Sequence, residues 1–254
     1  MSDKIVWVAA YPKTGSTWLR AIIQQILAPG DRAKDAIPSL HKVYPAEAPI
    51  YPIMGTEAKL LRTHSHPHQK FYLRAMENRS DEIIGIITIQ RHPLDVLLSQ
   101  LNYSFVMGDE RSFKNGVLKK AEQIISDGEI DHYIDAFIEA GGCPEHVERC
   151  GTYVGFFEKW REYSPNASRL HLRYEEMVED PKAGMREIQS FLQLPDVRID
   201  EVAAKIEDRT QVDGKFYWRK RAFNYRDLLP TDSIRRFEEG FSDELTELGY
   251  ESRA

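Results

Sequence analysis

A strand, a glycine turn and a helix follow one another without interruption near the start of the sequence. Residues 5–10 read Ile-Val-Trp-Val-Ala-Ala, an apolar, β-branched run that predicts a buried strand. Residues 11–18 read Tyr-Pro-Lys-Thr-Gly-Ser-Thr-Trp, and residues 19–27 suit a helix. Gly15 lets the backbone approach an anion closely, and the N–H groups of the first helical turn point toward it. This order of elements predicts an α/β fold with an anion cradle after its first strand.

The cradle differs from the common nucleotide P-loop. Lys13, Ser16 and Thr17 add donors to it. The P-loop motif G-x-x-x-x-G-K-[ST] has its lysine after the second glycine, followed by a hydroxyl that binds magnesium. Here the lysine precedes Gly15, and no Gly-Lys-Ser/Thr follows. The turn therefore predicts an anion site that requires no metal.

Composition restricts the class of protein. The chain has 254 residues, of which 42% are hydrophobic and 29% charged, as is typical of one globular domain. A formal net charge of −6 argues against nucleic acid and anionic membranes as partners. No apolar run approaches the roughly 20 residues of a membrane span, and the N-terminus lacks the pattern of a signal peptide. We expect a single cytoplasmic domain over residues 1–254. The C-x6-C spacing of Cys143 and Cys150 matches no zinc signature, so both are predicted to be reduced thiols.

The hydrophobic pattern alternates strands with helices. Strands are predicted at residues 4–10, 58–63, 82–90 and 168–173. Helices are predicted at residues 16–28, 69–78, 94–104, 113–126, 130–140, 144–163, 181–192, 198–207 and 231–248. This alternation predicts a P-loop-like, doubly wound parallel sheet flanked by helices, with ligands beyond the carboxyl ends of the strands. Residues 29–57 are rich in proline and predict an irregular loop over the site. Residues 104–150 are largely helical and form either a substrate lid or a further helical layer.

Two further basic loci follow later in the chain. Arg91 leaves the end of a buried strand, and Ser99 lies about two helical turns beyond it. An arginine fork with a hydroxyl suits a phosphate monoester, although Arg91 could instead pair with Asp95 and stabilise the turn. Residues 219–221 read Arg-Lys-Arg, which suits either an anion or a solvated turn.

In this order the three loci resemble the cytosolic sulfotransferase family, from about residue 5 to residue 240. Enzymes of that family take a sulfuryl group from 3′-phosphoadenosine-5′-phosphosulfate (PAPS) and release the desulfated product PAP. The resemblance implies transfer to a hydroxyl or amine of a small-molecule acceptor (an alcohol, phenol or amine), without a metal. It also implies that the nucleotide is bound by Lys13, Thr14, Gly15, Ser16, Thr17, Trp18, Arg91, Ser99, Tyr174, Thr210, Arg219, Lys220 and Arg221.

The resemblance implies a role for each group. Lys13 lies near the bridging oxygen of the phosphosulfate, Arg91 and Ser99 bind the 3′-phosphate, and residues 219–221 close over it. Arg221 departs from the family, which has glycine there, and the stretch after it is one residue shorter. No dimerisation motif lies between residues 226 and 235, so no oligomeric state is predicted. The resemblance also implies that Trp18, Tyr174 and Thr210 contact the adenine.

A histidine after the second predicted strand is the expected catalytic base. His64 follows Thr63 as the family's catalytic histidine follows its threonine, and an imidazole with a pKa of about 6.5 can accept a proton at neutral pH. His66 and Glu57 are rival bases. His64, His66 and His68 could instead bind a metal from one face of an extended segment, or His64 could be purely structural.

Two other functions stay open. An ATP-dependent small-molecule kinase would need a magnesium-binding Asp at a strand end, and none of the four predicted strands ends in one. A non-catalytic nucleotide-binding protein on the same scaffold would suit the altered residue at Arg221. The acceptor is undecided, because the aromatic residues near the pocket could frame a flat phenol or belong to the core. These are Tyr51, Phe71, Tyr103, Phe105 and Phe156.

Overall fold

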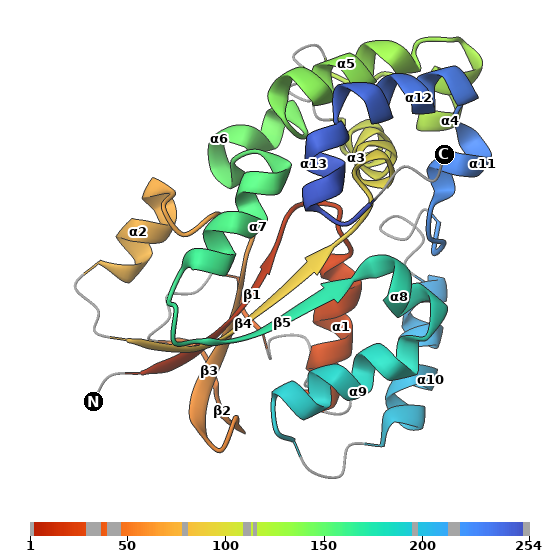
Figure 1. The fold of residues 1–254 in the computed structure, drawn as a ribbon. Helices are drawn as coiled ribbons and strands as arrows, with labels where there is room; N and C mark the ends of the chain where they lie inside the picture. The colour runs from red at the N-terminus through yellow and green to blue at the C-terminus, as the bar shows by residue number, and fades with distance from the viewer. Residues whose placement is uncertain are drawn as a thin grey trace.

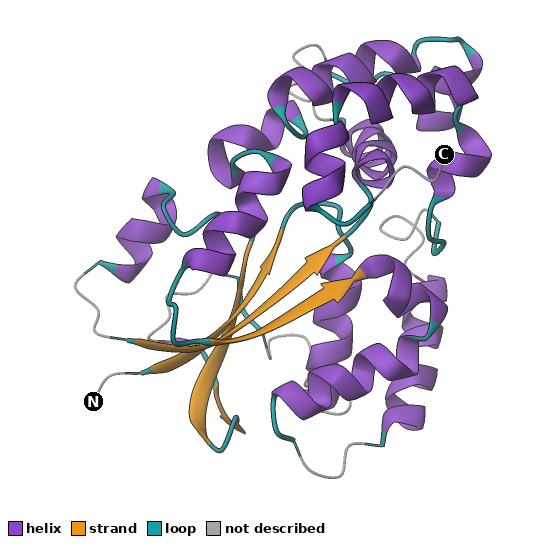
Figure 2. Ribbon diagram, in the orientation of Figure 1, coloured by secondary structure: helices purple, strands orange, loops and turns teal. Residues whose placement is uncertain are grey.

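A five-stranded sheet lies at the centre of the described chain, with helices on both of its faces (Figures 1 and 2). The structure is a computed structural model that describes residues 3–28, 37–39, 47–77, 81–108, 113, 116–194, 198–212 and 219–250. The strands lie in the order β2-β3-β1-β4-β5. They are β1 Lys4–Ala10, β2 Ile50–Ile53, β3 Thr56–Thr63, β4 Glu82–Gln90 and β5 Ser168–Arg173.

The strand order creates the switch point at which ligands bind in doubly wound sheets. β1 pairs in parallel with β3 on one side and with β4 on the other, and β5 extends the sheet in parallel beyond β4. The chain thus leaves β1 toward β3 and then passes back across β1 to reach β4. Such a reversal opens a crevice at the carboxyl ends of the strands. The predicted fold class is confirmed, with β2 as an antiparallel edge strand beside β3.

The helices occupy two layers. Their bounds are α1 Ser16–Leu27, α2 Lys70–Met76, α3 Pro93–Met107, α4 Ala121–Ser126, α5 Ile130–Ala140, the 3-10 helix η4 Pro144–His146, α6 Val147–Cys150, α7 Tyr153–Glu162, α8 Tyr174–Glu179, α9 Pro181–Phe191, α10 Ile199–Val212, α11 Asn224–Leu228, α12 Thr231–Gly240 and α13 Ser242–Glu247. Figure 1 places α1, α8, α9 and α10 on one face and α3, α5, α7, α12 and α13 toward the other. None of the helices within these described ranges has both the length and the apolar character that a membrane crossing requires.

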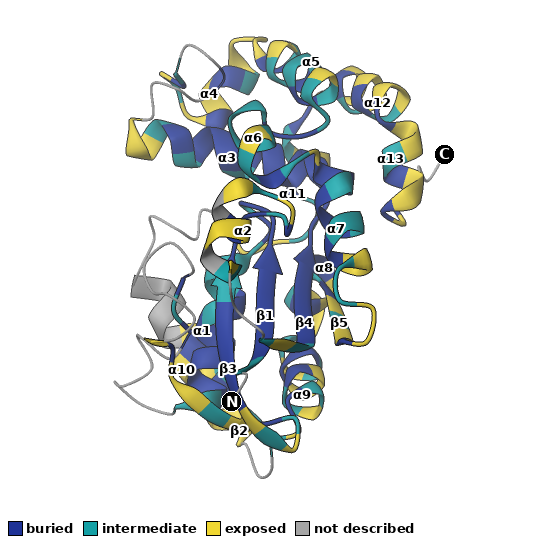
Figure 3. Ribbon diagram, turned by 90° about the vertical axis from the view of Figure 1, so that its left-hand side faces the viewer, coloured by how far each residue is buried: buried dark blue, intermediate teal, exposed yellow. Residues whose placement is uncertain are grey.

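Alternate side chains of the central strands point to opposite faces of the sheet and pack into two separate hydrophobic cores. Ile5 and Trp7 of β1 pack with side chains of α3, α5 and α7. Val6 and Val8 point to the opposite face, where they pack with α1, α9 and α10. Because both faces are covered, β1 and β4 are almost continuously buried (Figure 3), as their apolar sequences predicted.

Several predicted element boundaries are wrong. Residues 29–57 were expected to form an irregular loop, but residues 50–53 form β2. This strand pairs with β3 in the antiparallel sense and connects to its amino end by a tight turn. The remaining residues of that loop at 29–36 and 40–46 lie outside the described part. Residues 116–120 are not helical, so the helix expected at 113–126 begins only at Ala121.

Two predicted helices are each broken into shorter pieces. The helix expected at 144–163 is interrupted at Gly151, whose φ of 77° a helix cannot accommodate. The helix expected at 231–248 breaks at Phe241 between α12 and α13. The short helices α8 and α11 were not predicted, because runs of six and five residues carry too little periodicity.

Candidate functional site

A pocket of about 610 Å³ lies at the carboxyl ends of the parallel strands. Each of the four strands delivers one polar side chain to its wall. Lys13 follows β1, His64 follows β3, Arg91 follows β4 and Tyr174 follows β5. Because parallel strands end at the same edge of a sheet, residues far apart in the sequence meet there.

The turn between β1 and α1 has a geometry that only glycine fits. Gly15 has a φ of 104°, and a Cβ atom on it would lie 2.7 Å from Cδ2 of Tyr174. Its carbonyl accepts the N–H of Leu19 at 3.0 Å, which starts the helix. Ser16, Thr17 and Trp18 form the first turn of α1, and all three line the pocket. The N–H groups of such a first turn have no carbonyl within the helix to bind, so they suit an anion.

Lys13 reaches into the pocket from a residue of left-handed backbone conformation, with a φ of 70°. Its Nζ lies over the ring of Tyr103, 3.9 Å from the ring centroid. Burial, together with the positive charge of Arg91, lowers the pKa of Lys13 from its usual value to about 8. The ammonium is therefore poorly compensated in the protein alone, and a bound anion would stabilise it.

His64 is held by a hydrogen bond that fixes its tautomer. Its Nδ1 lies 2.7 Å from the carbonyl oxygen of Ala10, at the end of β1. Because a carbonyl only accepts, Nδ1 carries the proton and the lone pair of the neutral ring lies on Nε2. The rival bases lie elsewhere: His66 does not line the pocket, and Glu57 lies near the amino end of β3.

Arg91 is a buried cation stacked on an aromatic ring. Its Cζ lies 4.2 Å from the centroid of the Tyr174 ring, and only 6% of the residue is exposed. Trp18 meets the same tyrosine edge to face, with ring centroids 5.8 Å apart. The Nη2 of Arg91 donates to Asp95 at 3.3 Å, yet its Nε is buried without a hydrogen-bond partner. Arg91 thus retains a donor for a ligand. Ser99 of α3 lines the same pocket.

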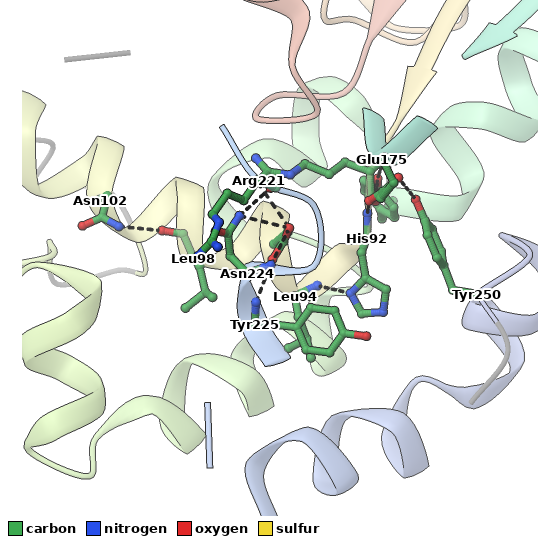
Figure 4. Close-up of polar contacts among 12 residues, drawn as sticks. His92, Leu94, Leu98, Asn102, Glu175, Arg221, Asn224, Tyr225 and Tyr250 are labelled. Atoms are coloured by element: carbon green, nitrogen blue, oxygen red, sulfur yellow. Dashed lines mark hydrogen bonds and ion pairs between the residues drawn. The ribbon is translucent and has the colours of Figure 1, made fainter. Parts of the chain in front are cut away.

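Asp95 joins Arg91 to the C-terminal segment of the chain. Besides Arg91, its carboxylate accepts the backbone N–H of Asn224 at 3.2 Å and that of Tyr225 at 3.0 Å. Figure 4 shows Asn224 also donating through its side chain to the carbonyl of Arg221, at 2.6 Å. Asp95 therefore serves the structural role considered for it in the sequence, and it also ties α11 to the residue that faces the pocket.

A second buried carboxylate fixes the junction between β4 and α3. Glu175 accepts the backbone N–H of His92 at 2.8 Å and the hydroxyl of Tyr250 at 2.9 Å (Figure 4). His92 in turn accepts the N–H of Leu94 through Nδ1 at 3.3 Å, which caps α3. Burial, and then the charges of Arg226, Arg173 and Arg91, lower the pKa of His92 to about 3. The imidazole is therefore neutral, and it caps the first turn of α3 directly after Arg91.

The C-terminal basic cluster is only partly in the pocket. Arg219 and Lys220 line it, and they pair with Glu122 at 3.0 Å and Glu207 at 4.0 Å. The side chain of Arg221 is 71% exposed, lies 3.7 Å from Asp227 and does not line the pocket.

Two further residues were expected in the nucleotide site, Thr14 and Thr210, and neither is among the described residues that line the pocket. Thr14 is fully buried and donates through Oγ1 to the carbonyl of Tyr11 at 2.8 Å, which shapes the turn from behind. Thr210 belongs to α10, but its side chain lies outside the described part.

Several residues that line the pocket were not predicted from the sequence, among them Gln100, His146 and Arg149. Gln100 of α3 donates to Glu145 at 2.6 Å and accepts from Nε2 of His146 at 3.1 Å. Arg149 of α6 completes this side of the wall. Burial, and then the charges of Arg149, His64 and Lys13, lower the pKa of His146 to about 3. These residues surround the part of the pocket next to His64 with polar groups.

The histidines after β3 do not assemble into a metal site in the structure. Within the described ranges, no group of three or more His, Cys, Asp or Glu side chains could hold a metal ion. The rings of His66 and His68 are tilted against one another with centroids 6.4 Å apart, and Nδ1 of His66 accepts the N–H of His68. Both cysteines are buried and form no disulfide in the structure.

Comparison with known proteins gives a consistent result. A family model for the sulfotransferase domain matches residues 3–249. Amine sulfotransferase of Oryctolagus cuniculus is 25% identical over 246 residues, covering 94% of this chain and 71% of the relative. Sulfotransferase 6B1 of Homo sapiens is 25% identical over 263 residues, covering 97% and 78%.

Solved structures share the fold. Mouse sulfotransferase SULT7A1 complexed with PAP has a TM-score of 0.62 at 17% identity, covering 99% of this chain and 89% of the other. Retinol dehydratase in complex with androsterone and PAP has a TM-score of 0.59 at 15% identity, covering 95% and 80%.

Proposed function

This chain belongs to the sulfotransferase family, and on that premise we propose that it transfers the sulfuryl group of PAPS to a hydroxyl or amine of a small molecule. The observation that carries the proposal is the convergence of Lys13, His64 and Arg91 on one pocket. Each follows a different parallel strand, so the anion turn, a candidate base and a second anion site face one cavity.

The described residues fit a bisphosphorylated adenosine. The turn around Gly15 offers the first N–H groups of α1 and the ammonium of Lys13 to the 5′ end. The unpartnered Nε of Arg91, with Ser99, would take the 3′-phosphate. Trp18 and Tyr174 offer aromatic surface for the adenine, and Arg219 and Lys220 add positive charge to the same wall.

His64 would act as the general base. PAPS supplies a sulfuryl group whose bond to the bridging phosphate oxygen breaks as the acceptor's oxygen or nitrogen forms its new bond to sulfur. Nε2 of His64, which carries the lone pair, takes the proton of the attacking group. Lys13 and the N-terminus of α1, which line the same pocket, would stabilise the negative charge that develops on the bridging oxygen.

We propose a single domain in which the helices of residues 104–150 form the acceptor side of the pocket. His146 and Arg149, which line it, support this role. The free thiols of Cys143 and Cys150 support a reducing compartment, such as the cytoplasm.

Titration calorimetry with PAP and with magnesium–ATP, followed by a transfer assay with labelled PAPS, tests the proposal. We expect binding of PAP in preference to ATP and labelled product with at least one alcohol, phenol or amine. Binding of ATP with transfer of phosphate would instead identify a kinase. Binding of PAP without transfer to any acceptor would identify a non-catalytic nucleotide-binding protein. The family match favours neither of these two.

A further inference from the structure

The acceptor side of the pocket contains an arginine that the transfer step does not use. Arg149 lies in α6 and lines the same pocket as His64. The backbone carbonyl of Arg149 accepts the N–H of His66 at 3.4 Å, so α6 packs directly against the loop that bears His64. A group bound by Arg149 would therefore lie on the acceptor side, beside the candidate base.

No carboxylate among the residues that the structure describes forms an ion pair with Arg149. Arg91, Arg219 and Lys220 each have a carboxylate partner. The guanidinium of Arg149 donates to the thiol of Cys150, a weak acceptor, and its Nε is buried without a hydrogen-bond partner. An unpaired, half-buried guanidinium beside a pocket is a strong site for a carboxylate, which it can bind through two parallel hydrogen bonds.

The groups around Arg149 leave it as the fixed positive charge of this wall. Burial and the neighbouring cations hold the pKa of His146 at about 3, so that ring is neutral at physiological pH. Gln100 is an amide whose oxygen accepts from His146 and whose nitrogen donates to Glu145 and to Ser104. A cationic acceptor would meet the charges of Arg149 and Lys13 without a compensating carboxylate among the residues that line this side.

Resting on the proposed function, we propose that the acceptor is a hydroxyl compound with a carboxylate, and that Arg149 binds this carboxylate while the hydroxyl faces His64. Arg149 then determines specificity without taking part in the transfer of the sulfuryl group. The carboxylate pairs with the guanidinium, while the hydroxyl proton passes to Nε2 of His64 as its oxygen bonds to sulfur.

Three phenols with one frame and different tail charges test the inference. Para-hydroxyphenylacetate, its methyl ester and tyramine carry a negative, a neutral and a positive tail. Omega-hydroxyhexanoate and its methyl ester repeat the comparison on an aliphatic frame. Each compound is titrated into the PAP-saturated protein and assayed with labelled PAPS. We expect at least one carboxylate to exceed its ester by about tenfold or more in affinity and in kcat/KM, the size of a charge-assisted hydrogen bond.

The variants separate Arg149 from its surroundings. Arg149→Met should reduce the carboxylate-to-ester ratio to about one through a higher KM for the carboxylate. Arg149→Lys should restore part of the ratio, and PAP affinity checks that both variants are folded. Arg74→Met is the matched control, because Arg74 is an exposed arginine of α2 that does not line the pocket. An equal loss for carboxylate and ester in Arg149→Met, with normal PAP binding, contradicts the inference.

The two readouts distinguish this inference from the proposed function. A carboxylate preference in binding without any sulfated product would support the site at Arg149 and overturn the transferase. Sulfation of esters or of tyramine at least as efficient as that of the carboxylates would support the transferase and overturn the inference. Wild-type protein that binds no carboxylate better than its ester also overturns it.

Discussion

The pocket has two halves that are built in different ways. In the strand-end half, Lys13, His64, Arg91 and Tyr174 each follow a parallel strand. In the helical half, Gln100 lies within α3, while His146 ends η4 and Arg149 lies in α6, the two short helices between α5 and α7.

Strand register places the first half. The ends of the parallel strands are aligned through the pairs Ala9 with Thr63 and Ala10 with Ile89. The residues that follow them are consequently positioned by backbone hydrogen bonds, whatever the acceptor. The helical half depends on packing between separate elements, so its chemistry can vary without disturbing the sheet. The difference teaches that strand register places the residues that we propose for sulfuryl transfer, whereas packing between helices places those that we propose for the choice of acceptor.

The most severe test of this division is His64→Ala. Loss of a general base should lower turnover by about 10²–10⁴-fold, while PAP affinity should stay nearly unchanged, because in our proposal His64 acts on the acceptor and not on the nucleotide. Turnover with labelled PAPS and titration with PAP measure the two effects. His66→Ala is the control, since His66 does not line the pocket. Unchanged turnover in His64→Ala would remove this residue from the mechanism.

Lys13→Ala should have the next largest effect. The ammonium lines the same pocket as the first turn of α1, and in our proposal both stabilise the charge on the leaving oxygen. Removal of one such donor lowers turnover by about 10²–10³-fold. Steady-state kinetics at saturating PAPS measure the loss in kcat. A variant that changes only KM would show that Lys13 binds the nucleotide without stabilising the transition state.

Arg91→Ala should weaken PAP binding by about 2–4 kcal/mol, as for one partner of a charged hydrogen-bonded pair. Adenosine 5′-monophosphate, which lacks the 3′-phosphate, should bind wild type and variant almost equally. Calorimetric titration of both nucleotides provides the comparison. Equal losses for the two nucleotides would mean that Arg91 does not recognise the 3′-phosphate.

Asp95→Asn should mainly reduce stability. Asp95 is 1% exposed and accepts from Arg91, Asn224 and Tyr225. The neutral amide of asparagine leaves the buried guanidinium of Arg91 without a countercharge. Its NH₂ group would also face N–H donors that the carboxylate accepts from. Together these effects should lower the free energy of unfolding by about 1–3 kcal/mol. Urea unfolding measures this. Asp232→Asn, at an exposed ion pair with Arg235, should leave stability nearly unchanged, and equal losses in both variants would contradict a special role for Asp95.

The smallest effect concerns pH. Because the pKa of Lys13 is lowered to about 8, its ammonium is present below that pH and is lost as the pH rises through it. PAP affinity should therefore fall above about pH 8 in the wild type, and Lys13→Ala should lack this step. Titrations with PAP across the pH range test it, and identical profiles for the two proteins would exclude Lys13 as the titrating group.

The two halves also differ in how far the sequence predicts them. The residues of the strand-end half could be predicted from the sequence, because an apolar run that marks a buried strand is followed closely by Lys13 in one case and by Arg91 in the other. Those of the helical half could not, because residues 144–163 have the pattern of one continuous helix. The chain instead forms η4 and α6 and then breaks at Gly151, and His146 and Arg149 of these two short helices line the pocket. Gly151, with its φ of 77°, was the available signal for a break. Which side chains then meet across α3 and α6 depends on tertiary packing, which local pattern does not encode.

A crystal structure with PAP bound tests most directly whether one nucleotide occupies the strand-end half. The predicted result is a 5′-phosphate at the turn of Lys13 to Thr17 and a 3′-phosphate at Arg91 and Ser99, with His64 and Arg149 facing an open acceptor side. A nucleotide whose two phosphates avoid these groups, or which fills the space beside Arg149, would contradict the division into a nucleotide wall and an acceptor wall.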